Sequence, residues 1–265
     1  ATVGFNLKNK GLIEDVKVTG SVTGNNDVAG IVNKIDEDGK IENVAFVGKI
    51  DSVGNNSTVG GIAGSNYMGF VNRAYVDATI TAQNANASML VPFVTYMLNS
   101  WKSGTKAKVT NSVAKGVLDV KNTRNVGGIV AKTWPYGAVQ DNVTYAKVIK
   151  GQEIFASNDV NDEDGGPHIK DLFGVVGYSS AEDGTGKDTK SPKKLKHLTK
   201  EEADKRVEGY KITADTFVSE PYALNTLNNV SSQADFANIQ DYNPEYKQAY
   251  KNIEKFQPFY NKDYI

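Results

Sequence analysis

The stretches Gly11-Leu12-Ile13-Glu14-Asp15-Val16 and Gly39-Lys40-Ile41-Glu42-Asn43-Val44 carry one pattern of glycine, apolar and polar residues, 28 positions apart. Their isoleucines begin a column of apolar residues that later copies continue: Ile13, Ile41, Val71, Val109 and Val139. A second apolar column follows nine positions later: Val22, Ile50, Ile80, Leu118 and Val148. A third consists of Ile31, Ile62, Val91, Ile129 and Val175. Columns of constant character that recur about every 30 residues indicate internal repeats.

Two more columns are defined by polarity and by size. The second residue after each member of the first column is polar: Asp15, Asn43, Arg73, Asn111 and Asp141. The seventh residue is small: Gly20, Gly48, Ala78, Gly116 and Ala146. Asparagines recur before the third column, and asparagine and glycine tolerate the left-handed backbone of a tight corner. The pattern therefore predicts short strands joined by sharp corners.

These columns predict a mainly β fold, a β-solenoid (parallel β-helix) of about five rungs followed by a smaller α-helical segment. Strands this short cannot bury a face alone. Stacked in register at ~4.8 Å, they turn each apolar column into an inward-facing ladder. A β-sandwich of hairpins is the alternative, but hairpins do not require the same columns in every repeat.

Three segments are expected: a solenoid over residues 1–178, a polar and basic linker over 179–198, and a helical segment over 199–265. Within the last, Thr199-Lys200-Glu201-Glu202 is a capping box and Asn243-Pro244 supplies an N-cap with a first-turn proline. This segment either caps an open end of the solenoid or connects it to a further region. Both ends of the sequence suggest a piece of a longer chain.

The composition disfavours several kinds of site. The chain has 265 residues, a net charge of −1, no cysteine and two histidines. Without cysteine there is no disulfide framework, zinc ribbon or thiol nucleophile. Neither His168 nor His197 belongs to a His-Glu-x-x-His motif. We therefore predict no catalytic residue, metal site or cofactor in this segment, no nucleic-acid partner and no membrane span.

One acidic stretch partly matches a calcium loop. Asp162-Glu163-Asp164-Gly165 has suitable ligands, but Val160 stands at the first ligand position and Asp171 at the twelfth. A flexible acidic loop is the preferred interpretation, and calcium binding around 159–165 stays open. A polysaccharide-active β-helix with paired carboxylates is a further alternative, for which no pair stands out.

The candidate substrate-binding residues are aromatic: Tyr67, Tyr96, Trp101, Trp134 and Tyr136. Tyr67, Tyr96 and Trp134 each follow a member of the third apolar column by five positions, where the first rung has Asp36. Stacked rungs would place these rings one above another, with the loop of Trp101 leaving the same edge. The rings either shield a corner or form a recognition strip for an extended peptide.

The repeats resemble a known family. The two stretches quoted first, together with Val59-Gly60-Gly61-Ile62-Ala63-Gly64, resemble the GLUG repeat of large surface proteins of Gram-positive bacteria. With Gln257-Pro258-Phe259-Tyr260-Asn261-Lys262, they resemble more narrowly the N-terminal, non-catalytic region of the immunoglobulin A1-protease family of zinc metalloproteases.

This resemblance implies a secreted or cell-wall attached virulence protein whose zinc site lies beyond Ile265. It implies that the segment is an accessory domain for substrate recognition. Its partners would be a host glycoprotein, such as immunoglobulin A1, and other domains of the parent chain. The alternative is a structural or adhesive solenoid that binds host matrix or spaces a catalytic domain. Whether the segment takes part in an enzymatic reaction is left open, since the parent would be the zinc metalloendopeptidase.

Overall fold

The computed structural model describes residues 3–7, 11–36, 38–95, 107–133, 137–150, 155–158, 176–177 and 196–216. They form a parallel β-solenoid and a single helix, α2 (Lys200–Tyr210). Among these residues no helix is long and apolar enough to cross a membrane.

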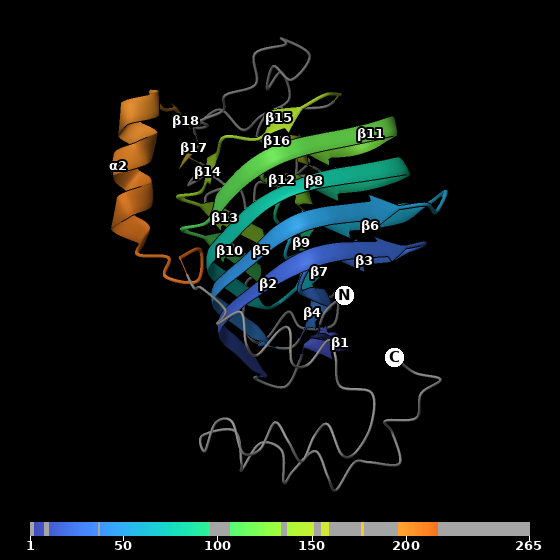
Figure 1. The fold of residues 1–265 in the computed structure, drawn as a ribbon, viewed down its shortest axis with the longest axis horizontal. Coiled ribbons are helices and arrows are strands. Elements are labelled where there is room, and N and C mark those ends of the chain that lie inside the picture. The colour runs from blue at the N-terminus through green and yellow to red at the C-terminus, as the bar shows by residue number, and fades with distance from the viewer. Residues whose placement is uncertain are drawn as a thin grey trace, which may run out of the picture. The chain divides into compact units, whose positions relative to one another are not determined.

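Four long parallel strands lie side by side along the solenoid (Figure 1): β2 (Leu12–Gly24), β5 (Lys40–Ser52), β8 (Phe70–Ser88) and β11 (Val113–Gly127). Shorter strands extend this sheet: β3 (Asp27–Ala29), β6 (Ser57–Gly60), β10 (Ala107–Thr110), β13 (Gly137–Gln140), β14 (Val143–Thr144) and β15 (Lys147–Val148). β2, β5 and β8 each begin one turn of the solenoid, β10 begins the turn that β11 continues, and β13 begins the next.

The chain closes each turn through a second parallel sheet. Its strands are β1 (Val3–Leu7), β4 (Val32–Asp36), β7 (Ala63–Tyr67), β9 (Phe93–Thr95), β12 (Val130–Thr133) and β16 (Phe155–Asn158). Separately, β17 (Val176–Gly177) pairs with β18 (Lys196–His197). The mainly β solenoid is confirmed, with about four complete turns against the five rungs expected.

The strand register confirms the first two apolar columns. Ile41 pairs with Ile13 on one side and Val71 on the other, and Val109 pairs with Val71 and Val139. Ile80 likewise pairs with Ile50 and with Leu118. The members in the inner turns are fully buried, whereas Val22 in the first turn is only half-buried. The columns are therefore ladders in the core, as expected.

The third column is offset by one residue in the third turn. Tyr67 of β7 pairs with Thr95 of β9, where the sequence count aligned Tyr67 with Tyr96. Both Leu90 and Val91 are buried at the preceding corner, so either residue satisfies an apolar column. Val175, assigned to this column, lies outside the described residues.

The polar column lies at a left-handed corner inside each turn. Asp15, Asn43, Arg73, Asn111 and Asp141 have φ values of 54°, 51°, 56°, 50° and 53°. Asparagine and aspartate adopt this conformation more readily than other residues that have a Cβ. This backbone requirement explains why the column is polar, and Arg73 is the member that departs from the preferred residue types.

The small column follows from close stacking of backbones. A Cβ on Gly48 would overlap the carbonyl oxygen of Gly20, and one on Gly116 would overlap that of Ala78. A Cβ on Gly20 would meet nothing within 4 Å, because Gly20 lies in the first turn of the ladder. The column is therefore small because each turn rests directly on its predecessor.

The helix is held against the outer side of the solenoid and crosses its turns (Figure 1). Thr199 and Glu202 form the expected capping box, in which Glu202 N–H donates to the Thr199 hydroxyl at 3.2 Å. We call residues 198–216 the strap. The strap lies as a brace along the side of the solenoid, and whether the segment 199–265 caps an end or connects to a further region stays a prediction. Residues 178–195 and 217–265, including Asn243-Pro244, lie outside the described residues, and the domain boundaries stay predictions.

Candidate functional site

Tyr67 is the one candidate binding residue within the described part of the chain. It ends β7, is half-buried, and pairs in register with Asp36 of the first turn, as the sequence predicted. Tyr96, Trp101, Trp134 and Tyr136 lie outside the described residues, so their role stays a prediction. In the sequence, Tyr96 and Trp101 stand between β9 and β10, and Trp134 and Tyr136 stand between β12 and β13.

The corner that follows Tyr67 is fixed by a buried asparagine. The Asn66 amide donates to the carbonyl oxygens of Gly69 at 3.0 Å and Lys108 at 3.1 Å, and its Oδ1 accepts from Gly69 N–H at 2.8 Å. Asn66 is fully buried, and Met68 beside it has a φ of 99°. These three bonds hold the corner between Tyr67 and Phe70 and tie it to the next turn.

Phe70 continues the aromatic surface on the other side of this corner. It pairs in register with Lys40 of the preceding turn and Lys108 of the following one. The two ammonium groups lie 5.8 and 5.9 Å from the centre of its ring. Both lysines are exposed, and Phe70 is half-buried. Cation–π contacts at exposed sites contribute about 0.5–1 kcal/mol each, so they orient these side chains without burying them.

Tyr67 has a cationic neighbour too. Lys34 Nζ lies 4.6 Å from the centre of the Tyr67 ring and 3.0 Å from a carboxylate oxygen of Asp36. We call Lys34, Lys40, Tyr67, Phe70 and Lys108 the aromatic corner. It offers aromatic surface between positive charges, which suits a ligand that combines apolar groups with anionic ones.

Sequence reasoning found Tyr67 and missed the other four residues of the aromatic corner. A signal did exist for three of them: Lys40, Phe70 and Lys108 each stand immediately before a member of the first apolar column. Because neighbouring residues of a strand face opposite sides, that position points outward. A cationic or aromatic side chain occupies that outward position in three successive turns.

A second outward surface, on the long strands, is covered by the strap. Lys17, Ala45, Tyr75, Val113 and Val143 follow one another in register on the outer face. We call this column the flank. Val113 and Val143 form a buried cluster with Leu198, Ala203 and Tyr210 of the strap, and Tyr75 packs against it. The flank is therefore internal to the fold.

Polar contacts align the strap with successive turns in reverse order. Arg206 pairs with Asp141 at 2.9 Å, and Arg73 donates to the Lys211 carbonyl at 2.6 Å. The Asn43 amide donates to the Thr213 hydroxyl at 2.6 Å, and Lys17 donates to the Asp215 carbonyl at 3.2 Å. An 11-residue helix is about 16 Å long, close to three rung spacings. The chain thus returns from the last described turns to the first.

Asn43 is the most connected residue of this contact. Its Oδ1 accepts from the backbone N–H groups of Thr213 at 2.8 Å and Ala214 at 3.1 Å. Its amide also donates to Asp15 at 2.5 Å. Asn43 therefore satisfies two backbone donors of the strap while it occupies the left-handed corner of its own turn.

The strap also changes the pKa values of groups beneath and within it. Burial raises the pKa of Tyr75 to about 12, with smaller effects from the nearby Asp77 and Asp215 carboxylates. Burial likewise raises the pKa of Tyr210. Hydrogen bonds from Lys200 and then Tyr145 lower the pKa of Asp204. These shifts reflect burial, hydrogen bonds within the strap, and a hydrogen bond between the strap and Tyr145 of the solenoid.

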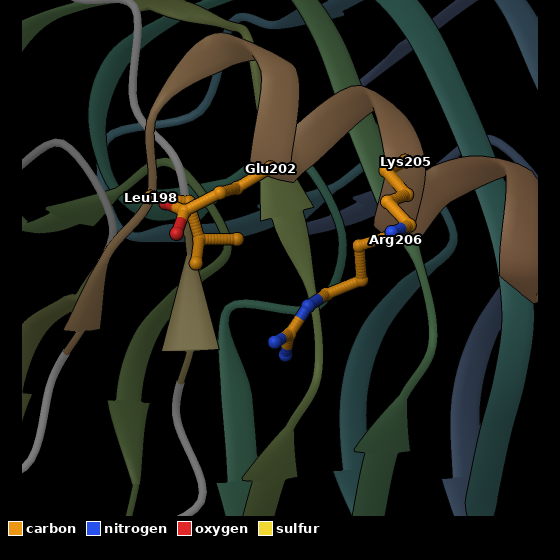
Figure 2. Close-up of a pocket in the computed structure, with 4 residues that line it drawn as sticks. All are labelled: Leu198, Glu202, Lys205 and Arg206. Atoms are coloured by element: carbon orange, nitrogen blue, oxygen red, sulfur yellow. The ribbon is translucent and has the colours of Figure 1, made fainter.

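A shallow pocket on the strap is lined by Leu198, Glu202, Lys205 and Arg206 (Figure 2). Arg206 extends from the helix toward the strands below, where it forms its ion pair with Asp141. In the part of the chain that the structure describes, no group of three or more histidine, aspartate or glutamate side chains is arranged to hold a metal ion. The acidic stretch 159–165 and His168 lie outside that part.

Comparison with known proteins finds relatives that are much longer than this chain. Over its whole length the chain is 50% identical to zinc metalloprotease ZmpB of Streptococcus pneumoniae serotype 4, of which it covers 14%. Zinc metalloprotease ZmpC of the same organism is 30% identical over 97% of the chain, which covers 13% of that protein. An immunoglobulin A1 protease of Streptococcus sanguinis is 24% identical over 94% of the chain, which covers 14% of it.

The chain therefore spans about one-seventh of the length of the curated relatives it matches. No protein-family model matches the chain, and no solved structure matches it significantly.

Proposed function

This chain belongs, as a segment, to the family of zinc metalloproteases and immunoglobulin A1 proteases, and we propose that it is a non-catalytic domain that recognises the substrate of its parent protein. The resemblance found in the sequence is thereby confirmed for the family. The GLUG label rests on the repeat residues alone and stays a prediction.

The observation that carries this proposal is the aromatic corner. Asn66 fixes the backbone between Tyr67 and Phe70 through three hydrogen bonds, and lysines stand beside both rings. A rigid surface loses little conformational entropy on binding, and aromatic side chains contribute strongly to protein interfaces. The four further aromatic candidates lie outside the described residues, and their part in binding stays a prediction.

The reaction itself is assigned to another part of the parent. The relatives are named zinc metalloproteases, and we place the zinc and its ligands outside this segment. Such a parent acts outside the cell, secreted or attached to the cell wall. The segment would bind a host glycoprotein such as immunoglobulin A1 and bring its cleavage site to the catalytic domain, with which it would also be in contact.

Binding of immunoglobulin A1 to the 265-residue chain, measured by surface plasmon resonance, tests this proposal. We expect Tyr67→Ala and Phe70→Ala to weaken binding, and Tyr96→Ala and Trp134→Ala to act in the same direction. Val53→Ala is the control, because Val53 is 50% exposed and is not part of the aromatic corner. Unchanged binding in all four variants would show that the rings are structural.

A structural role is the second candidate, and the strap favours it. The strap contacts the turns of Lys17, Asn43, Arg73 and Asp141, so it ties successive turns of the solenoid into one brace. A stiff solenoid is a suitable spacer between a cell surface and a catalytic domain, or a scaffold that grips host matrix. This role predicts no affinity for the protease substrate and unchanged turnover when the segment is deleted from the parent.

A further inference from the structure

We propose that the aromatic corner binds an acidic peptide in the polyproline II conformation, with carboxylates three residues apart contacting Lys40 and Lys108. This inference rests on the proposed recognition function and specifies the ligand of that surface.

The charge of the aromatic corner is only partly balanced. Lys34 has a carboxylate partner in Asp36 at 3.0 Å. Lys40 and Lys108 are exposed, and within the described residues their contacts are to the Phe70 ring and not to any carboxylate. Their ammonium groups are thus available to a ligand carboxylate, to which they would donate charge-assisted hydrogen bonds.

The spacing of the two lysines selects the conformation of the ligand. Lys40 and Lys108 pair with Phe70 from opposite sides, so they stand two rungs apart, about 9.6 Å at the usual strand spacing. A polyproline II helix advances about 9.3 Å in its three-residue turn, which presents residues i and i+3 on one side. Same-side residues of a β-strand repeat at about 6.7 Å, and one α-helical turn advances about 5.4 Å.

The rings between the lysines suit the same ligand. Phe70 lies between the two ammonium groups, and Tyr67 lies across the corner that Asn66 holds. Polyproline II segments dock on aromatic surfaces because they are extended and already ordered before binding. A ligand and a surface that are both ordered in advance lose little entropy on association.

The test uses three synthetic peptides and the 265-residue chain, with affinities from isothermal titration calorimetry. One proline-rich peptide carries glutamates at i and i+3, the second carries them at i and i+2, and the third has glutamine in place of both. We expect the first to bind about tenfold more tightly than the others, as two exposed ion pairs allow. Its affinity falls with added salt.

Matched lysine variants test the contacts themselves. K40Q with K108Q is expected to lower the affinity of the i, i+3 peptide to that of the glutamine peptide. K49Q is the control, since Lys49 is exposed on a different outward column, and it leaves the affinity unchanged. Unchanged far-ultraviolet circular dichroism shows that the variants are folded.

Three results overturn the inference. They are equal affinity for all peptides, no effect of the double lysine variant, and binding of a sulfated oligosaccharide in place of the peptides. Should immunoglobulin A1 bind in a Tyr67-dependent way while the peptides show no preference, the inference fails and the proposed function stands. Should the i, i+3 peptide bind selectively while immunoglobulin A1 does not, the inference stands and the proposed function fails for that substrate.

Discussion

The flank and the aromatic corner both carry aromatic side chains on the outside of the solenoid, but they differ in what covers them. On the flank, Tyr75 and Val113 pack against the strap, which is attached through Asn43, Arg73 and Asp141. At the aromatic corner, Tyr67 and Phe70 contact lysine side chains and stay half-exposed.

This difference is the basis on which we propose recognition for the aromatic corner and packing for the flank. An apolar residue on an outer face is compatible with packing inside the chain or with binding a partner. The flank uses its residues for packing, because a segment of the same chain covers them. The aromatic corner presents a rigid backbone and polar neighbours instead, which is why we assign recognition to it. Each region also depends on one buried asparagine, Asn43 or Asn66, and the two can be tested separately.

The largest effect is expected from Asn43→Ala. Alanine would have to adopt the left-handed φ of 51°, at a cost of about 1–2 kcal/mol. Two strap N–H groups would also lose their acceptor, at about 1–3 kcal/mol. We expect the free energy of unfolding, from urea denaturation, to fall by about 3 kcal/mol. Asn43→Gly tolerates the φ and should recover about 1 kcal/mol. Equal losses in the two variants would contradict the assigned strain.

A smaller loss is expected from Asn66→Ala, because its backbone is not left-handed. The variant leaves Gly69 N–H and the Lys108 carbonyl without their side-chain partner, at a cost of about 2 kcal/mol in unfolding free energy. It should also loosen the aromatic corner. Hydrogen exchange of the Gly69 amide, measured by NMR, is expected to accelerate, while exchange in the strap stays unchanged. Faster exchange in both regions would show that they are not independent.

Two tyrosines compare the regions directly. Tyr75→Ala removes a ring that packs against the strap, and we expect a loss of about 2 kcal/mol, below the cost for a full core aromatic. Tyr67→Ala removes a ring in contact with Lys34, and we expect less than about 1 kcal/mol. Chemical denaturation of both variants measures the difference. A larger loss for Tyr67→Ala would place that ring among the packing residues.

At neutral pH the smallest effect is expected from Tyr75→Phe, which changes how the free energy of unfolding depends on alkaline pH. The pKa of Tyr75 in the folded state, about 12, lies above the ordinary tyrosine value of 10.0 because the side chain is buried. The Tyr75 hydroxyl therefore keeps its proton to a higher pH in the folded state than in the unfolded state. The resulting contribution to the free energy of unfolding is present below about pH 10 and is lost as the pH rises toward 12. Tyr75→Phe should show a shallower fall in unfolding free energy over this interval. Identical pH profiles would indicate that the strap does not bury this hydroxyl.

Much of the solenoid was predictable because its repeats obey local rules. Gly48 and Gly116 are small because a neighbouring backbone leaves no room for a Cβ, and Asn43 is polar because its backbone is left-handed. Thr199 and Glu202 form the capping box that their spacing predicts. In each case the requirement acts within one repeat or between adjacent repeats. The residue types that satisfy it therefore stand at a fixed spacing in the sequence.

Other features could not be read in this way. Tyr67 pairs with Thr95 and not with Tyr96, the residue that the apolar columns align with it. The sequence does not show this one-residue offset, because Leu90 and Val91 at the preceding corner are both apolar and buried. Within the aromatic corner the sequence pointed to Tyr67 alone, because only the fold brings lysines from three different turns beside the two rings.

The sequence by itself determined the stacked turns and their inward ladders, since backbone and packing requirements that recur in every turn select the same residue types at a fixed spacing. It also determined the start of the helix, through the local capping box. Only the tertiary structure decided where the strap lies and which outward residues stay open. The contact between Asn43 and Thr213 joins positions 170 residues apart, and the strap residues in such contacts belong to no repeat. A contact without repetition leaves no periodic pattern, and its partners become visible only when the folded chain brings them together.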